Sequence, residues 1–239
     1  MKVFIVLRYG LAAALCIFSS TSHAGIQLGG TRIVYPASDR EASILVKNQG
    51  SDDVMIQSWI EPNGEGADAD VPFAITPALA RMGGNKQQML RIFYHGRGLA
   101  DDRESVFWLN VQEIPQQAKG QNTLQVAVRQ RIKVFYRPAG ITGTLDEAAK
   151  QLQWRLVSRA GVSQLEVKNP SDFYISIGSM KLKNVLQEYE VEDQMLAPKS
   201  TSYLTVKKLS ALPQHTVQLH WEAINDYGGL VRHELPVGY

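Results

Sequence analysis

The chain has 239 residues, of which 44% are hydrophobic and 20% charged, and its formal net charge is +2. Lys2 and Arg8 lie in a leader at residues 1–24, so the remainder carries 23 basic and 23 acidic residues and offers no electrostatic basis for binding nucleic acid or a membrane surface. The only cysteine, Cys16, lies in the same leader, which excludes cysteine nucleophiles, thiolate metal sites and disulfides from the rest of the chain.

The leader has the features of a secretory signal peptide. Its two basic residues precede an apolar run at 11–18, and Ser22 and Ala24 supply the small residues that precede a cleavage site. A membrane anchor would need about 20 apolar residues. We therefore expect an exported chain that begins at residue 25 and depends on hydrophobic cores for its stability.

Residues 25–138 have the pattern of a first domain built from short β-strands. Seven runs alternate apolar and polar residues, and Asn/Gly clusters between them supply turns. The runs are TRIVYP (31–36), ASILVKNQG (42–50), VMIQSWI (54–60), FAITP (73–77), QMLRIFYHG (88–96), SVFWLNVQEIP (105–115) and LQVAVRQRIKVFYRP (124–138). Their number and spacing are typical of an immunoglobulin-like β-sandwich.

A proline and glycine break at residues 138–140 predicts the start of a second domain, residues 139–239. Thr144 and Glu147 form a capping-box pattern, which predicts a short helix over LDEAAK. Six more strand-like runs follow: QLQWRLVS (151–158), SQLEVKNP (163–170), FYISIGSMKL (173–182), SYLTV (202–206), HTVQLHWEAI (215–224) and LVRHELPV (230–237). NDYGG at 225–229 predicts a hairpin between the last two. The fold class predicted is all-β, with two immunoglobulin-like β-sandwiches in tandem.

Residues capable of catalysis do not form a recognisable pattern. His95, His215, His220 and His233 show no ligand-pair spacing. The chain has no nucleophile-elbow motif, and HGRGLAD at 95–101 lacks the third glycine of a phosphate-binding loop. We therefore expect no enzyme activity, no metal and no cofactor.

The run from Leu124 to Tyr136 is unusually long for a strand. One parity is apolar apart from Gln130, and the other carries the cations Arg129, Arg131 and Lys133, with Arg137 on the same parity directly after the run. A strand of about 13 residues would extend roughly 40 Å, whereas strands average about five or six residues. Two interpretations are open: a central strand whose apolar side fills its own core, or a strand that projects toward the second domain or a partner chain.

Two motifs carry a resemblance to a known family. LADDRESVFWLNVQEIP (99–115), followed by QRIKVFYRPAG (130–140), resembles the periplasmic chaperones of the chaperone–usher pilus pathway. TRIVYP and NDYGG match further positions of that family, so the resemblance spans the mature chain. Gln116 and Ala78 depart from the family pattern, which affects loop geometry only.

The resemblance implies a binding mechanism by strand donation. Leu124, Val126 and Val128 would enter the open groove of a pilus subunit that lacks its final strand. Arg32 and Lys133 match the two cations that bind the subunit's C-terminal carboxylate in a cleft between the domains of an L-shaped molecule. Sliding a strand by two residues restores the same face, so these cations would set the register.

The resemblance also implies an interdomain ion network. Glu104, Arg137 and Asp226 match its positions, and we expect it to be exposed and to orient the domains more than stabilise them. The short connection at 116–122 resembles the short-loop class, which serves rod-like pili.

The implied function is a periplasmic chaperone that folds pilus (fimbrial) subunits and delivers them to an outer-membrane usher, with possible self-association when it is free. The alternative is a secreted two-domain β-sandwich module that binds carbohydrate or protein. That alternative predicts an aromatic cluster on a surface, whereas we expect core packing for Trp59, Trp108, Trp154 and Trp221.

Overall fold

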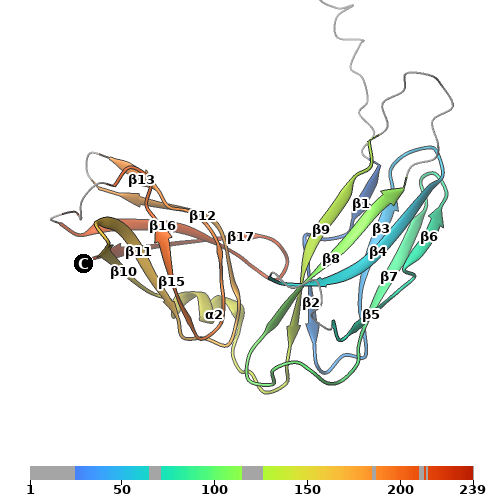
Figure 1. Cartoon of the computed structure of the whole chain (residues 1–239), viewed down its shortest axis with the longest axis horizontal. Helices are drawn as coiled ribbons and strands as arrows, with labels where there is room; N and C mark the ends of the chain where they lie inside the picture. The colour runs from blue at the N-terminus through green and yellow to red at the C-terminus, as the bar shows by residue number, and fades with distance from the viewer. Residues whose placement is uncertain are drawn as a thin grey trace, which may run out of the picture.

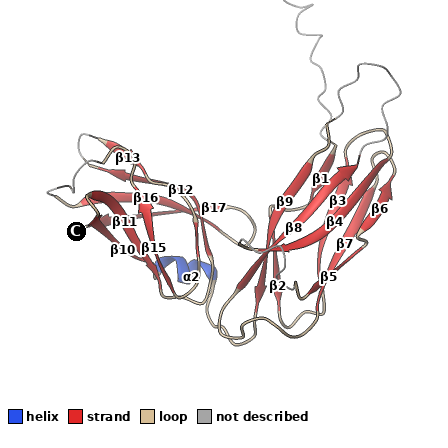
Figure 2. Ribbon diagram, in the orientation of Figure 1, coloured by secondary structure: helices blue, strands red, loops and turns tan. Residues whose placement is uncertain are grey.

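The computed structural model describes residues 25–64, 71–114, 126–184, 187–209, 213 and 215–238, so the expected signal peptide lies outside the described residues. The predicted all-β, two-domain fold is confirmed. Figures 1 and 2 show β-sandwiches that meet at one end and diverge from it. The described part of the second domain contains one short helix.

Two antiparallel-rich sheets form the first domain. One has the order β1-β3-β7-β5 and the other the order β2-β9-β8-β4-β6. The strands are β1 (Ile26–Leu28), β2 (Arg32–Pro36), β3 (Ala42–Asn48), β4 (Val54–Pro62), β5 (Phe73–Thr76), β6 (Leu79–Met82), β7 (Gln87–Tyr94), β8 (Ser105–Ile114) and β9 (Arg129–Arg137). All seven predicted runs contain a strand, and β1 and β6 are additional. β1 has only three residues, too few to show an alternation, and β6 has four.

Side-chain alternation assigns each strand of the second sheet an inner and an outer face. In β9, Ile132, Val134 and Tyr136 are buried in the first core, and in the parallel neighbour β2 so are Ile33 and Tyr35. The intervening residues of both strands therefore point away from that core. Each fully buried aliphatic side chain contributes about 1.5–3 kcal/mol of transfer free energy.

The expectation of one unbroken strand from Leu124 to Tyr136 is wrong at residues 126–128, and residues 124–125 lie outside the described residues. β9 begins at Arg129, and residues 126–128 lie outside it, although the Glu113 amide still donates to the Val128 carbonyl at 2.9 Å. The register between β8 and β9 runs only as far as the pair Gln112 and Arg129, so residues 126–128 have no regular ladder with β8, although Glu113 and Ile114 still belong to that strand. The apolar and polar alternation of the sequence therefore continues to the N-terminal side of Arg129, where β9 no longer has a regular partner.

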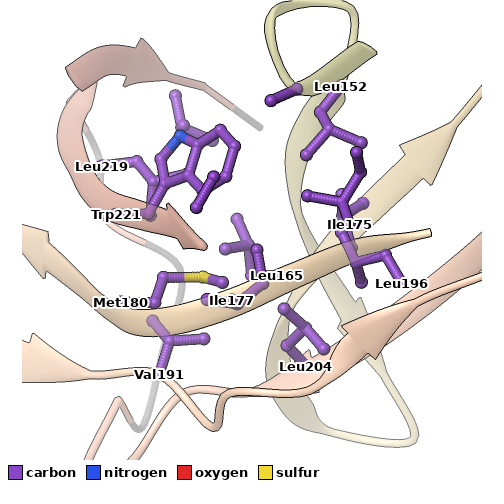
Figure 3. Packing of buried hydrophobic residues seen from close by; sticks show 14 of the residues in the cluster. Leu152, Leu165, Ile175, Ile177, Met180, Val191, Leu196, Leu204, Leu219 and Trp221 are labelled. Carbon is purple, nitrogen blue, oxygen red and sulfur yellow. The ribbon is translucent and has the colours of Figure 1, made fainter. Parts of the chain in front are cut away.

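The second domain contains one three-stranded and one five-stranded sheet. Their orders are β10-β11-β15 and β13-β12-β16-β17, with β14 paired to β12. The strands are β10 (Gln153–Arg159), β11 (Val162–Asn169), β12 (Ile175–Lys183), β13 (Glu188–Glu190), β14 (Met195–Leu196), β15 (Ser200–Thr205), β16 (Val217–Ile224) and β17 (Leu230–Val237). Figure 3 shows Trp221 pointing into the core of this domain with Leu219 beside it.

The predicted helix is confirmed as α2 (Leu145–Lys150). Thr144 accepts a hydrogen bond from the Glu147 amide, and the Glu147 carboxylate accepts one from the Thr144 amide. This reciprocal pair satisfies two amides that a helix start otherwise leaves unpaired. Ala148 and Ala149 face the core, so the helix closes one end of the second sandwich.

One asparagine in each domain holds the sandwich together in the same way. Asn48 ends β3 and donates to the carbonyls of Asp52 and Gly83, at 2.8 and 3.1 Å. Asn169 ends β11 and donates to the carbonyls of Phe173 and Ala197, at 2.8 and 2.9 Å. Both are almost fully buried, and each is the last residue of the same triplet, VKN. A buried amide with its partners satisfied specifies one packing arrangement, because any other leaves it unpaired.

Candidate functional site

Arg32 and Lys133 occupy adjacent positions on neighbouring parallel strands. Arg32 of β2 is the register partner of Lys133 of β9. Alternation directs both side chains away from the first core and toward the second domain. The Arg32 Nη1 donates to the Ile224 carbonyl at 3.1 Å, and the Lys133 Nζ donates to the Ser176 Oγ at 3.4 Å. The structure therefore brings the two predicted cations together where the domains meet.

Neither of these cations has a carboxylate partner among the described residues. The structure records no salt bridge for Arg32 or Lys133 there, and the Arg32 Nε is buried without a hydrogen-bond partner. Burial lowers the pKa of Lys133, and the positive charge of Arg32 lowers it further. Burial also lowers the pKa of Arg32, against an opposing effect of Asp226 and Glu104. Two half-buried cations with unused donors form a site that fits an anion such as a carboxylate.

Arg137, four residues after Lys133, has the opposite environment. Its guanidinium lies 2.7 Å from Glu104 and makes two hydrogen bonds to Asp226, at 2.9 and 3.0 Å. The three predicted network residues are therefore joined, with Asp226 contributed by the second domain. The second Glu104 carboxylate oxygen accepts from the Tyr174 amide at 2.8 Å.

The expectation that this network is exposed is wrong. The side chain of Glu104 is 1% exposed and that of Arg137 is 22% exposed. Burial raises the pKa of Glu104 even though Arg137 and the Tyr174 amide favour its charged form. Packing of the second domain against Glu104 removes it from solvent, and single-strand alternation cannot show that. Removal of one partner should therefore cost more than it does in a surface pair, because it leaves an uncompensated charge buried.

The hairpin between β16 and β17 presents Asp226 to Arg137. The Asn225 side chain accepts hydrogen bonds from the amides of Tyr227 and Gly229, at 3.0 and 2.8 Å. Gly228 has φ +84°, and a Cβ there would clash with the Thr31 Oγ1 of the first domain. The turn therefore needs glycine both for its backbone and for its close approach to the first domain.

Several junction residues were missed from the sequence. Lys199 bridges the domains by contacting Asp102 at 2.9 Å and Asp172 at 3.1 Å. Ser176 and Tyr174 come from the start of the strand run FYISIGSMKL, where a serine between isoleucines is a weak signal. Their roles depend on which surface packs against Glu104 and Lys133, and no local pattern contains that information.

Of the residues predicted for strand donation, the structure describes Val126 and Val128, which directly precede β9. Val126 is 66% exposed and Val128 is 42% exposed. Leu124 and the connection at 116–122, on which the short-loop interpretation rests, lie outside the described residues. The two described valines present apolar surface that no part of the described chain covers, unlike Ile132 and Val134 of the same run.

Core packing of all four tryptophans is only partly correct. Trp221 is buried, and Trp154 packs against the second core. Trp59 and Trp108 instead lie half-buried on the outer face of the second sheet of the first domain. The guanidinium of Arg131 covers the Trp108 ring at 4.3 Å from its centroid. A ring whose face already holds a side chain is a poor platform for stacking a sugar.

The described part of the chain lacks two other functional features. No cluster of three or more His, Cys, Asp or Glu residues suited to a metal ion occurs there. None of the described helices has the length and apolarity needed to cross a membrane.

Comparison with known proteins gives consistent matches over both domains. Residues 25–142 match the pili and flagellar-assembly chaperone PapD N-terminal domain, and residues 147–235 match the pili assembly chaperone PapD C-terminal domain. The probable fimbrial chaperone YadV of Escherichia coli is 35% identical over 232 residues, covering 91% of this chain and 94% of its own.

Solved structures of such chaperones are similar as well. The YadV chaperone structure has a TM-score of 0.78 and 33% identity, covering 89% of this chain and all of the other. A chain from the Salmonella enterica SafA pilin in complex with the SafB chaperone has a TM-score of 0.73 and 25% identity, covering 91% and 97%. Since both domain families match in order and a 35% identical relative covers most of the sequence, the chain belongs to the PapD family of pili assembly chaperones.

Proposed function

We propose that this protein is a periplasmic chaperone that binds and folds pilus subunits by donating a strand, and then delivers them to an outer-membrane usher. Membership of the pili assembly chaperone family supports this role, as does the likeness to a structure that holds a pilin together with its chaperone. The mechanism is stoichiometric and uses residues of the chain without a cofactor. The leader at residues 1–24 supports a periplasmic location.

The observation that carries the proposal is the uncompensated pair Arg32 and Lys133. A folded protein avoids half-burying two adjacent cations without counter-charge, because desolvation of each is costly. The pair is therefore best explained as a site kept open for an anionic ligand. The C-terminal carboxylate of a subunit fits because it is planar, negative and located at the end of a chain.

The apolar residues before β9 supply the second part of the mechanism. Leu124, Val126 and Val128 would replace the missing strand of a subunit, with backbone hydrogen bonds for affinity and aliphatic side chains for its open core. Each buried side chain contributes about 1.5–3 kcal/mol, and association entropy offsets a large part of that gain. A carboxylate bound at Arg32 and Lys133 would prevent a slip of two residues along the strand.

The test is native mass spectrometry of the protein purified from periplasm with candidate subunits co-expressed. The variants are Lys133→Ala and Lys168→Ala, the second removing an exposed lysine of the second domain as the matched control. We expect one-to-one complexes for wild type and for Lys168→Ala, and loss of the complex for Lys133→Ala.

The other outcomes have distinct meanings. A complex that survives Lys133→Ala would refute the role of Lys133 as the carboxylate anchor and leave strand donation as the source of binding. No complex between the wild type and any subunit would refute the proposed function and favour the secreted binding module.

A further inference from the structure

Trp108 lies beside Lys133 on the outer face of the first domain. The two residues are register partners on the antiparallel strands β8 and β9. The Lys133 Nζ lies 5.6 Å from the Trp108 ring centroid, and the Trp108 Nε1 donates to the Asn63 Oδ1 at 3.0 Å. A cation within about 6 Å of an aromatic face is attracted by the ring quadrupole. Asn63 thus holds the Trp108 ring by a hydrogen bond, and the ring in turn contacts the Lys133 ammonium.

The carboxylate of Glu61 pairs with Arg131 and not with Lys133. Glu61 lies 3.3 Å from Arg131 and accepts a hydrogen bond from the Trp59 Nε1 at 2.8 Å. The Trp59 hydrogen bond lowers the pKa of Glu61, which keeps this carboxylate charged. Arg131 covers the Trp108 ring while pairing with Glu61. The arrangement leaves Lys133 next to the ring without the carboxylate, so its charge stays available.

The lysine side chain has four rotatable bonds and would otherwise sample many positions. In the structure it has two described contacts, the Trp108 ring and the Ser176 Oγ, which lie on different domains. We propose that Trp108 is a positioning residue that holds the Lys133 ammonium toward the domain junction and so pre-organises the carboxylate anchor. This inference rests on the proposed function, because it assigns the anchor to Lys133.

The first experiment measures how much a terminal carboxylate adds to binding. The probe is a synthetic peptide of alternating valine and serine, prepared with a free C-terminal carboxylate and as the C-terminal amide, and Kd is measured for both. For wild type we expect the acid to bind at least about tenfold more tightly than the amide, as two charge-assisted contacts imply.

The Trp108 variants should separate the ring from general packing. Trp108→Leu should reduce the acid-to-amide ratio about fivefold, the size expected for a partly desolvated cation–π contact. Trp108→Phe retains an aromatic face and should keep the ratio within about twofold of wild type. Trp154→Phe, which changes a partly buried tryptophan in the second domain, is the matched control and should leave the ratio unchanged.

A second readout does not depend on binding. The order parameter of the Lys133 Cε methylene, from ¹³C relaxation of the free protein, reports side-chain motion on the picosecond to nanosecond scale. It should fall in Trp108→Leu, remain high in Trp108→Phe, and stay unchanged for the control Lys168 in every variant.

The outcomes separate this inference from the proposed function. A wild-type protein that binds acid and amide equally would refute the carboxylate anchor and, with it, the role assigned to Lys133. A wild-type preference that persists in a folded Trp108→Leu protein would overturn the role of Trp108 and leave the anchor intact. Unchanged Lys133 order in Trp108→Leu would also overturn it, whatever the peptides show.

Discussion

Three cations on the same outer face of the first domain have contrasting environments. Arg137 is neutralised by Glu104 and Asp226, whereas Arg32 and Lys133 have no carboxylate partner among the described residues. All three are partly buried against the second domain, so desolvation penalises each. Two carboxylates offset the desolvation cost of Arg137. Arg32 and Lys133 have only a backbone carbonyl and a hydroxyl oxygen, respectively, as hydrogen-bond acceptors.

The contrast separates a structural site from a binding site. In a closed ion network every charge has its partner within the fold. Removing one member therefore leaves another charge buried without a partner. An open cationic pair costs stability until a ligand arrives. The comparison therefore predicts opposite effects of mutation at the two places, large on stability at Arg137 and large on binding at Arg32 and Lys133.

The largest expected effect is the loss of folding stability in Arg137→Ala. The variant leaves the Glu104 carboxylate buried without its cation, which should lower the free energy of unfolding by about 3–5 kcal/mol. Urea denaturation followed by tryptophan fluorescence measures it. Arg129→Ala, at an exposed position of the same strand, should change stability by less than about 0.5 kcal/mol. A loss below about 1 kcal/mol for Arg137→Ala would mean that the network is not structural.

The next effect is on subunit binding in Arg32→Ala. Removing a charge-assisted contact should cost about 1.5–3 kcal/mol, or about ten- to a hundredfold in Kd. Isothermal titration with a purified subunit fragment measures it, and Arg40→Ala on the exposed turn after β2 is the control. Equal affinity for Arg32→Ala and wild type would place the subunit's carboxylate elsewhere.

A smaller effect, of the opposite sign, is expected for the stability of the free protein in Lys133→Met. Because the pKa of Lys133 is lowered in the folded state, its charge is disfavoured there, and the variant should have a higher thermal midpoint at neutral pH. The sign follows from linkage: the penalty is full below the folded-state pKa and disappears as pH rises toward the ordinary value of 10.5. The advantage of Lys133→Met should therefore shrink at alkaline pH.

Thermal melts of wild type and Lys133→Met at several pH values measure this gain in thermal midpoint and its loss at alkaline pH. Lys168→Met provides the comparison, because an exposed lysine should give no pH-dependent gain. A midpoint for Lys133→Met that falls below wild type at neutral pH would show that the contacts with Trp108 and Ser176 outweigh desolvation.

The smallest stability effect is expected for Asp226→Ala. Its side chain is 31% exposed, and Arg137 would keep its contact with Glu104, so the cost should be about 1 kcal/mol or less. The interdomain geometry should nevertheless loosen, because Asp226 joins the β16–β17 hairpin to β9. Small-angle scattering measures this, with Asp193→Ala as control. A scattering curve that superimposes on wild type would count against an orienting role.

Elements with a local signature were predictable from the sequence. Period-two alternation located the longer strands, and the Thr144 and Glu147 pattern located α2, because both depend on residues within a few positions of each other. The two-residue strand β14 and the three-residue strands β1 and β13 are too short for such a pattern. The start of β9 was placed too early, since alternation continues where the regular ladder with β8 has ended.

The residue types of the candidate site were also accessible from the sequence, through the family resemblance, but its environments were not. Nothing local distinguishes Arg137 from Lys133: both are cations of one strand and one parity. Nor does the alternation show that Glu104 is buried or that Trp108 lies outside the core. Each of these depends on what packs above the residue.

The sequence by itself determined which residues alternate, where turns and the helix start occur, and which cations share a face of β9. These follow from backbone geometry and act over a few residues. Only the tertiary structure decided that the second domain brings Asp226 to Arg137, and Ser176 and the Ile224 carbonyl to Lys133 and Arg32. Charge compensation depends on distance and solvent exclusion between residues far apart in the chain, so the difference between a closed network and an open anion site arises only once the domains are packed together.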